Sequence, residues 1–310
     1  MKIDHILFPV DFSEPSQSLN SEVAWLASHF NSRVTLLHVF EVPTSWYGEG
    51  EIPLIRSEDI LAYAESEKQL LSDYAIQIPE NRVQRMSAEG GAAWHIANWT
   101  RRHEVDLIVM GTHGYGAFRR LMLGSVAMKV MHDVSCPVWT HALHSGAGDG
   151  MNKMDGISNI VCAIELTDEA VPLLRFTKTL AEELAANVRI VHTVTDTESR
   201  LYKYFDLTKM VGEEISNLQT QAGTDFPISL TKSYIAQNTT QVALERRADL
   251  IVIGRGKSQA AFGSLRTHAY EIIRRASCPV LSYSTDWHPH NSSALGQDKR
   301  PEPVANIVNT

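Results

Sequence analysis

The sequence predicts an α/β protein built from two tandem doubly wound domains, each a five-stranded parallel sheet with helices on both faces. Short apolar runs alternate with stretches of helical periodicity, which is the pattern of such a sheet. The two halves of the 310-residue chain repeat each other. The length also favours two domains, because single domains most often have about 100–150 residues.

The internal repeat is the observation that fixes the domain organisation. Four segments of the first half recur in the second half in the same order and with nearly the same spacings, so one domain is duplicated. The pairs are "ILFPVDFSEP" (6–15) with "IVCAIELTDE" (160–169), "RVTLLHV" (33–39) with "NVRIVHT" (187–193), "VDLIVMG" (105–111) with "ADLIVIG" (248–254), and "SCPVW" (135–139) with "SCPVL" (277–281).

Within the first copy, the elements alternate in the order βαβαβαβαβ, which implies right-handed crossovers. The apolar runs have few polar interruptions, as expected for parallel strands covered on both faces. They lie at 6–10, 34–39, 106–110 and 136–140. The expected helices run from a cap at Ser13 to about Phe30, from about Ser57 to Ile78, over "AAWHIANWTRRH" (92–103) and over "GSVAMKVMHDV" (124–134).

Composition places the domain boundaries. The first domain is expected at 1–141 and the second at 157–284, joined by a linker at 142–156 that is rich in glycine and polar residues. Residues 285–310 lose the apolar pattern and are predicted to be a disordered tail. The fifth strands of both copies, "CPVWTH" and "CPVLSY", are apolar edges. We expect them to pair, which would make the chain an intramolecular pseudo-dimer.

Charge and composition exclude several classes of protein. A net charge of −8 argues against a general nucleic-acid binder, and no apolar run is long enough for a membrane span. The start, "MKIDHILFPVDF", predicts a strand and not a signal peptide. Three scattered cysteines, Cys136, Cys162 and Cys278, show no metal-binding spacing and are expected to be small core residues. We therefore expect a cytoplasmic protein.

A glycine-rich segment, "GTHGYGAFRRLMLGS" (111–125), follows the apolar run "VDLIVM". Ligands of doubly wound sheets bind beyond the carboxyl ends of the strands. Gly124 and Ser125 would begin the next helix, whose first N–H groups and dipole attract anions. The segment by itself fits a phosphate site and a flexible connection with a serine cap equally well.

The spacing G-x2-G-x9-G-S, followed by a helix and "CPV", resembles the universal stress protein family, and more narrowly its ATP-binding branch. In this sequence the motif residues are Gly111, Gly114, Gly124 and Ser125. The resemblance covers about residues 3–141 and 157–284. It implies a Rossmann-like fold and bound ATP, or ADP or AMP, with Mg²⁺ as a candidate companion ion.

The resemblance also implies which residues contact the nucleotide. Asp11 would contact the adenosine part, the backbone of Val39 would line the adenine pocket, and His113 would lie near the phosphates. The complete predicted set is Pro9, Val10, Asp11, Val39, Gly111, His113, Gly114, Gly124, Ser125 and Val126.

The residues taken by themselves leave some roles open. Asp11 either accepts hydrogen bonds from the nucleoside or assists Ser13 at a helix start. His113 is either a ligand contact or a solvated loop residue, and His38 is expected to be a satisfied, semi-buried histidine. Arg119 and Arg120 either lend positive potential to phosphates or lie on a solvated helix face. No metal-ligand set and no catalytic residue is predicted.

The second copy departs from the motif. Gly254 matches Gly111, but Lys257 replaces the second glycine and Glu165 replaces Asp11. Counting back from "SCPV" places Arg266 and Thr267 where Gly124 and Ser125 stand in the first copy. Side chains at glycine positions would crowd a phosphate, so we expect one nucleotide per chain. Direct contact of an anion by Lys257 and Arg266 remains the alternative.

These observations predict a stress-response protein that binds an adenine nucleotide in its first domain, as a nucleotide-dependent switch or binding module. No Walker-type loop or SGGxDS-like loop is present, and Asp11 and Glu14 are the only carboxylates expected near the site. We therefore expect no enzyme activity beyond weak ATP hydrolysis. A nucleotide-independent scaffold or chaperone-like protein and a slow ATP hydrolase are the alternatives. The expected partners are the nucleotide and a candidate second copy in a homodimer, with neither nucleic acid nor membrane.

Overall fold

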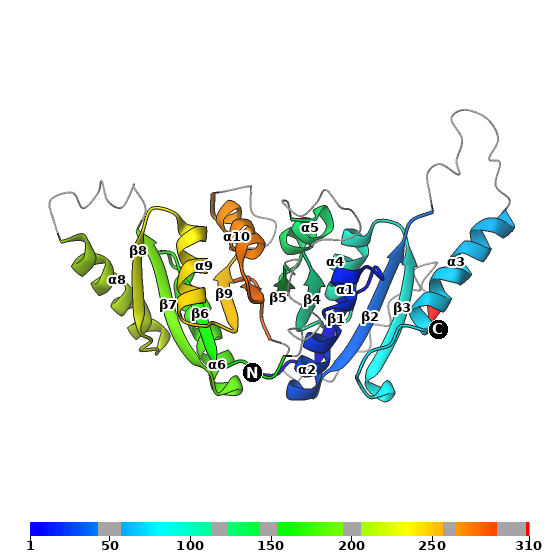
Figure 1. Ribbon diagram of the computed structural model, residues 1–310, viewed down its shortest axis with the longest axis horizontal. Coiled ribbons are helices and arrows are strands. Elements are labelled where there is room, and N and C mark those ends of the chain that lie inside the picture. The colour runs from blue at the N-terminus through cyan, green and yellow to red at the C-terminus, as the bar shows by residue number, and fades with distance from the viewer. Residues whose placement is uncertain are drawn as a thin grey trace, which may run out of the picture. The chain divides into compact units, whose positions relative to one another are not determined.

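The computed structural model describes residues 1–42, 57–112, 123–142, 154–194, 206–256, 264–289 and 308–309. The chain has two compact units (Figure 1). The amino-terminal unit is Lys2–Met110 together with His288–Thr310, and the carboxy-terminal unit is Gly111–Trp287 together with Met1.

The amino-terminal unit has parallel strands in the order β3-β2-β1-β4. The strands are β1 (His5–Pro9), β2 (Arg33–Phe40), β3 (Val83–Glu89) and β4 (Leu107–Gly111, its last residue counted with the other unit), and β11 (Val308–Asn309) pairs antiparallel with β3. The helices are α1 (Glu14–Gln17), α2 (Asn20–Phe30), α3 (Ser57–Ser72), a 3-10 turn (Glu80–Arg82) and α4 (Ala92–Arg102).

The carboxy-terminal unit contains the complete second copy and the end of the first. Its strands follow the order β5-β10-β9-β6-β7-β8. They are β5 (Val138–His141), β6 (Asn159–Ala163), β7 (Asn187–Val194), β8 (Ile228–Lys232), β9 (Leu250–Gly254) and β10 (Val280–Tyr283). The helices are α5 (Ser125–Asp133), α6 (Ala170–Leu184), α8 (Leu207–Ala222), α9 (Ile235–Glu245) and α10 (Ser264–Arg275).

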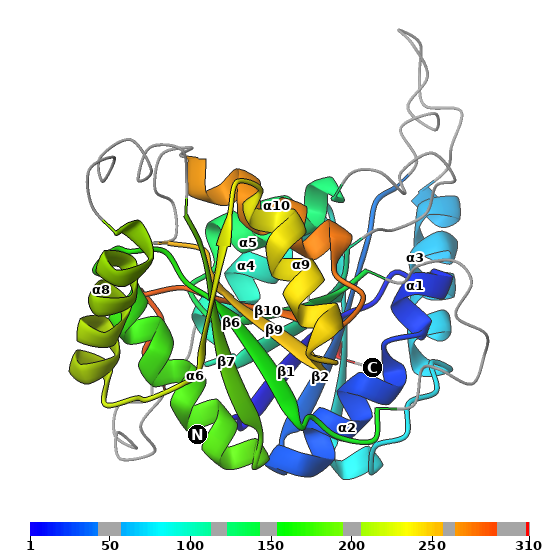
Figure 2. The same cartoon turned by 60° about the vertical axis from the view of Figure 1, so that its left-hand side comes forward.

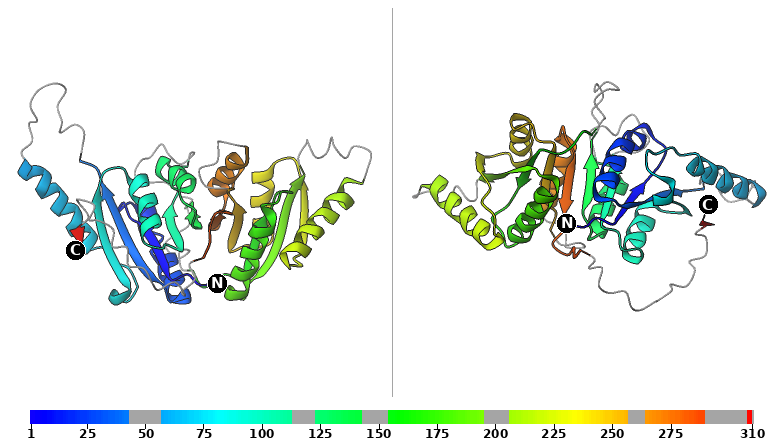
Figure 3. Two further views of the ribbon diagram at one scale, coloured as in Figure 1. Left: turned by 180° about the vertical axis from the view of Figure 1, so that it is seen from behind. Right: turned by 90° about the horizontal axis from the view of Figure 1, so that it is seen from below.

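The predicted fold class is confirmed. Strands β10-β9-β6-β7-β8 are parallel and make the five-stranded sheet of the second copy. Strands β3-β2-β1-β4 of the first copy have the same order as β8-β7-β6-β9. In the second copy α6 packs with α8 and α9 packs with α10 (Figure 2). The two helix pairs cover opposite faces of the sheet, as right-handed crossovers require (Figure 3).

The fifth strands pair as predicted. β5 and β10 run antiparallel, with Trp139 opposite Leu281. Two hydroxyls add to the ladder, since Thr140 Oγ1 donates to Val280 O and Ser282 Oγ donates to Val138 O, each at 3.2 Å. This pairing explains why α5 and β5 belong to the carboxy-terminal unit.

Two predicted helices differ from the structure, and one strand was not located from the sequence. The helix predicted from Ser13 to Phe30 is two helices, and the break lies beside Leu19, which is fully buried. The helix predicted to Ile78 ends at Ser72, because the chain beyond it turns inward and buries Tyr74 and Ile78. Strand β3 lacks an apolar run, since only three of its residues are buried.

The folded part of the second copy extends beyond residue 284, where its apolar pattern ends. Trp287 lies in the segment predicted to be disordered, yet its side chain is 7% exposed. Its ring meets those of Phe176 and Tyr283 at centroid distances of 5.7 and 6.2 Å. Residues 290–307 and most of the predicted linker lie outside the described residues. No helix in the described parts of the chain is both long and apolar enough to cross a membrane.

Candidate functional site

In the amino-terminal unit, three predicted site residues lie at the carboxyl ends of two neighbouring strands. Pro9 ends β1 and pairs with Leu37 of β2. The N–H of Val10 donates to Leu37 O at 3.0 Å. Val39, the penultimate residue of β2, is half-buried. Pro9, Val10 and Val39 therefore lie at the carboxyl edge of these strands, and their contact with a ligand stays a prediction.

Asp11 follows this edge and begins a tight turn. Its Oδ1 accepts hydrogen bonds from Ser13 Oγ at 2.6 Å and from Ser13 N at 3.1 Å, and Ser13 Oγ caps α1 through Ser16 N at 3.3 Å. Phe12 has a φ of 61°, the left-handed conformation that a turn this tight requires. Asp11 thus assists the helix start, and Oδ2 makes no hydrogen bond within the described part of the chain.

His38 of β2 supports the same edge through a hydrogen bond to the backbone of Val10. Its Nδ1 donates to the carbonyl oxygen of Val10 at 2.8 Å, and its Nε2 lies 2.9 Å from Oε2 of Glu67 on α3. The expectation of a satisfied histidine is confirmed, and the ring is buried more deeply than expected. The second copy repeats the contact, because His192 Nδ1 lies 3.0 Å from Ile164 O. Glu67 is a supporting residue that the sequence did not single out.

In the carboxy-terminal unit, α5 presents an N-terminus without a side-chain cap. Gly124 is its N-cap, with φ −59° and ψ 143°, and no side chain among the described residues caps the helix. The N–H of Gly124 donates to Thr112 O at 2.8 Å, and Gly124 O accepts from Met128 N at 2.9 Å. The first N–H groups that follow Gly124 have no intrahelical acceptor. Ser125 and Val126 are exposed there, as an anion site requires.

The predicted site residues fall into two groups. Pro9, Val10, Asp11 and Val39 come together in the amino-terminal unit, and Gly111, Gly124, Ser125 and Val126 belong to the carboxy-terminal unit. Gly111 is the last residue of β4, the strand that pairs with β1. His113, Gly114, Arg119 and Arg120 lie outside the described residues.

The corresponding edge of the second copy encloses a small acidic cavity. Its volume is about 50 Å³, and its lining includes Glu165, Glu169, Gly254 and His268. A Cβ atom at Gly256 would lie 3.6 Å from Oε2 of Glu169, so this carboxylate occupies the space beside the strand end. The charge and the size of the cavity both disfavour a phosphate.

Helix α10 corrects the alignment of the two copies. It begins at Ser264, three residues before Thr267, where counting from "SCPV" placed its start. Ser264 therefore begins this helix, as Ser125 does in the first copy. Because α10 has 12 residues and α5 has 9, the second copy has a longer helix and a shorter loop. Lys257 lies outside the described residues.

The Asp, Glu, His and Cys side chains of the described residues form no group of three or more that would hold a metal ion.

The sequence profile of the Universal stress protein family matches residues 2–140 and 156–283. The chain belongs to this family. Universal stress protein A homolog 1 of Coxiella burnetii is 30% identical over 141 residues, which cover 44% of this chain and 95% of the relative. Universal stress protein MJ0531 of Methanocaldococcus jannaschii is 28% identical over 138 residues, or 43% of this chain and 78% of the relative.

A solved structure extends the likeness to both copies. The universal stress protein from Archaeoglobus fulgidus DSM 4304 aligns with a TM-score of 0.66 at 18% identity, covering 92% of this chain and 99% of that chain. This likeness concerns the fold. The protein is thus a universal stress protein with two family domains in tandem.

Proposed function

We propose that this universal stress protein binds one adenine nucleotide, ATP or ADP or AMP, in its first copy and acts as a nucleotide-dependent binding module in the cytoplasm. The observation that carries the proposal is the uncapped start of α5 directly after Gly124. This start completes the motif of Gly111, Gly114, Gly124 and Ser125. Free N–H groups and the positive end of a helix dipole are a suitable binding site for phosphates.

The phosphates would be held mainly by the backbone. The N–H groups of Ser125 and Val126 and the Ser125 hydroxyl would donate to phosphate oxygens, together with amides of the 111–114 segment. His113 would add a further donor. A Mg²⁺ ion bound with the nucleotide would neutralise phosphate charge, since phosphates commonly supply most protein-bound Mg²⁺ ligands besides water.

The nucleoside would lie on the edge formed by β1 and β2. Asp11 would accept hydrogen bonds from ribose hydroxyls through Oδ2, the oxygen that Ser13 does not use. Pro9 and Val10 would pack on the nucleoside, and the backbone of Val39 would line the adenine. His38 supports this edge through the carbonyl of Val10.

Substitution of Gly124 by Asp tests the proposal. The φ and ψ of Gly124 suit any residue, and Asp is among the preferred N-caps, so α5 should keep its stability. The carboxylate would occupy and repel the phosphate position. Loss of two or three charge-assisted hydrogen bonds, each worth about 1.5–3 kcal/mol, should weaken ATP binding by about a hundredfold or more in a calorimetric titration.

Gly91→Asp is the matched control. Gly91 is the uncapped N-cap of α4, and a Cβ there would meet no atom within 4 Å. At a hundredfold excess over Kd, ATP should stabilise the unmodified protein by about 2.7 kcal/mol and so raise its melting temperature. Gly91→Asp should show the same rise in melting temperature. If Gly124→Asp keeps the full shift, α5 is not the phosphate site.

Two further measurements separate the alternatives. Mass spectrometry of the purified protein should detect a carried adenine nucleotide, and titration with ATP, ADP, AMP and GTP, with and without Mg²⁺, should rank the ligands. Sustained phosphate release well above background would instead indicate an ATP hydrolase. Absence of binding by every nucleotide would favour a nucleotide-independent scaffold.

A further inference from the structure

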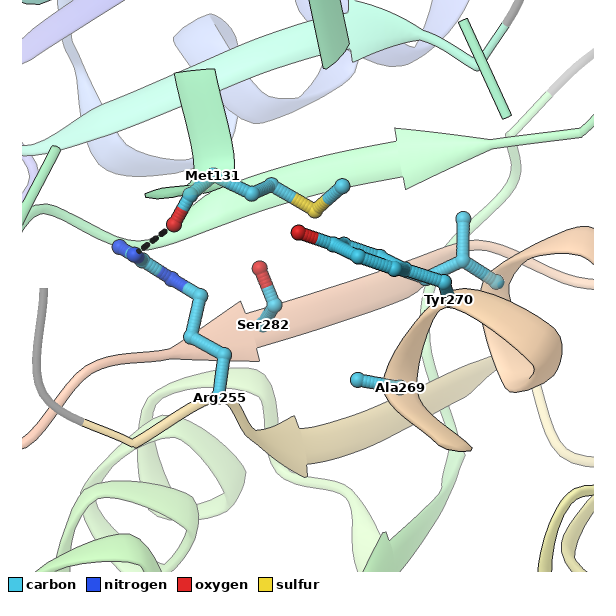
Figure 4. A pocket seen from close by; sticks show the side chains of 6 residues that line it. Met131, Arg255, Ala269, Tyr270 and Ser282 are labelled. Carbon is cyan, nitrogen blue, oxygen red and sulfur yellow. Dashed lines mark hydrogen bonds between the residues drawn. The ribbon is translucent and has the colours of Figure 1, made fainter. Parts of the chain in front are cut away.

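Arg255 of the second copy reaches into the end of the first copy. It follows β9 directly, and its side chain is 6% exposed. Nη1 donates to Met131 O at 2.6 Å and to Val134 O at 2.7 Å, and Nη2 donates to Cys136 O at 2.6 Å. Figure 4 shows the guanidinium directed at Met131, beside Ser282 of β10.

The three acceptors mark the carboxyl end of α5. Met131 belongs to the last turn, Val134 is the C-cap, and Cys136 follows. The last carbonyls of a helix have no intrahelical donor, and a positive charge there also complements the helix dipole. The guanidinium therefore satisfies carbonyl oxygens that would otherwise be unpaired in a buried place.

The backbone of Arg255 is fixed as well. Its N–H donates to Tyr283 O of β10 at 2.9 Å. Since β10 pairs with β5, the strand that follows α5, the same sheet holds both the arginine and the helix. The void beside the guanidinium is only about 10 Å³, so the side chain has little room to move.

The first copy has no arginine at the position equivalent to Arg255. The position of Arg255 in the second copy corresponds to Thr112 in the first, because Gly254 matches Gly111. A threonine is too short to reach three carbonyl oxygens at a helix end, and it has one donor where arginine has five.

We propose that Arg255 is a positioning residue for the nucleotide site of the first copy. It fixes the carboxyl end of α5, and this keeps the N–H groups of Ser125 and Val126 aligned for phosphates. The second copy thereby serves the first copy's site in place of binding a nucleotide itself. This inference rests on the proposed function.

The length of α5 makes the coupling effective. A helix of nine residues is only about 14 Å long and is marginal in isolation. Loss of its carboxyl anchor would leave three carbonyl oxygens without the guanidinium and would let the helix fray or shift. Misaligned donors must then be ordered on binding, which lowers affinity.

Arg255→Met and Arg255→Lys test the inference in the full-length protein. Met keeps the chain length and removes every donor, whereas Lys keeps the charge with fewer donors in the wrong geometry. ATP affinity should fall about tenfold in Arg255→Met and by a smaller factor in Arg255→Lys, at unchanged stoichiometry. Where Arg255→Met does not fold, Arg255→Lys decides the matter.

Arg175→Met is the control for loss of an arginine–carbonyl contact away from α5, at an exposed position. Arg175 Nη2 also donates to a backbone carbonyl, Gln221 O, at 2.7 Å, but it joins α6 to α8 and does not contact α5. It should bind ATP as the unmodified protein does. Amide hydrogen exchange adds a readout specific to α5: residues 127–133 should lose protection in Arg255→Met and not in Arg175→Met.

The outcomes are distinct. If the unmodified protein binds ATP and Arg255→Met binds it equally tightly, Arg255 is only a structural contact and the inference is overturned. If Arg175→Met weakens binding as much, the effect is general destabilisation and the inference is likewise overturned. If the unmodified protein binds no adenine nucleotide, the proposed function fails and the inference fails with it.

Discussion

The imidazole of His38 and the carboxylate of Glu67 lie 2.9 Å apart, with both side chains largely withdrawn from water. Because the Val10 carbonyl can only accept, Nδ1 of His38 carries a proton, and Nε2 faces Oε2 of Glu67 at hydrogen-bond distance. The pair joins α3 to β2. His38 also holds the carbonyl of Val10, the residue that precedes Asp11.

Removal of this carboxylate should destabilise the amino-terminal unit. Glu67→Ala leaves the buried Nε2 of His38 without its hydrogen-bond partner, so the free energy of unfolding in urea should fall by about 1–3 kcal/mol. Glu67→Gln should cost less, because an amide still hydrogen-bonds to Nε2. Glu65→Ala on the same helix is the control: Glu65 is 75% exposed, and its pair with Lys68 should contribute less than about 1 kcal/mol. Equal effects of both alanines would contradict the assignment.

Stability should fall with acidification because of His5. Burial, assisted by the charge of Arg33, lowers the pKa of His5 from 6.5 to about 4. The unfolded chain then binds more protons than the folded chain between these two values, so the free energy of unfolding decreases as pH falls through that range. The contribution is at most about 3 kcal/mol.

The geometry agrees with a neutral ring, whose Nδ1 lies 2.8 Å from His103 O and whose Nε2 lies 2.8 Å from Thr35 Oγ1. Urea midpoints measured from pH 7 to pH 4 should show a smaller slope in His5→Gln, whatever its stability at pH 7. An unchanged slope would assign the acid sensitivity to other groups.

The cysteines should be unreactive in the folded protein. All three are buried, and burial raises the pKa of Cys162 to about 12. A disulfide reagent at pH 8 should therefore modify Cys162 only after unfolding, when three thiols become titratable. Rapid labelling of Cys162 in the native protein, located by mass spectrometry, would show that the unit opens readily.

The fold class and most of the strands could be predicted from the sequence. Buried parallel strands appear in it as apolar runs, and the duplication appears as a repeat of these runs at nearly the same spacing. Ser13, Gly124 and Ser125 mark helix starts through local chemistry, and they stand where expected. Strand β3 escaped the same reasoning, since a half-exposed strand carries few apolar residues.

Side-chain contacts between segments that are far apart in the chain could not be predicted from the sequence. Glu67 has the same periodicity as any helical glutamate, and its pairing depends on where α3 packs. The buried position of Arg255 was not predicted, because the surrounding sequence, "GRGK" (254–257), favours a solvated loop. An arginine directly after a buried strand was the one available signal. Trp287 was missed because a single tryptophan in a polar tail gives no periodicity.

ATP should bind with a stoichiometry near one. The second-copy cavity of about 50 Å³ is far below the roughly 300 Å³ or more of small-molecule sites, and Glu165 and Glu169 line it. Calorimetric titration should give one site, and Gly124→Asp should weaken ATP binding at that site by about a hundredfold or more. Two equal sites, or residual binding at full affinity in that variant, would show that the acidic edge accepts nucleotides.

Trp287 should be part of the folded second copy. Trp287→Ala removes a large ring that packs edge-on against the stacked rings of Phe176 and Tyr283, so the free energy of unfolding should fall by about 3–5 kcal/mol. Trp94→Ala provides the comparison, because Trp94 is 51% exposed and its loss should change stability by about 0.5 kcal/mol or less. Similar values for both would place Trp287 outside the core.

The β5–β10 pairing also changes what evolution can do with the interface. In a symmetric homodimer every contact occurs twice, so a residue gained on one surface is gained on its twin. Covalent joining removes that constraint, and it also keeps the partner strand present at any protein concentration. One copy can then keep the glycines of the family motif while the other gains a side chain such as Arg255, where the first copy has Thr112. After the duplication, each half of the chain can therefore mutate alone.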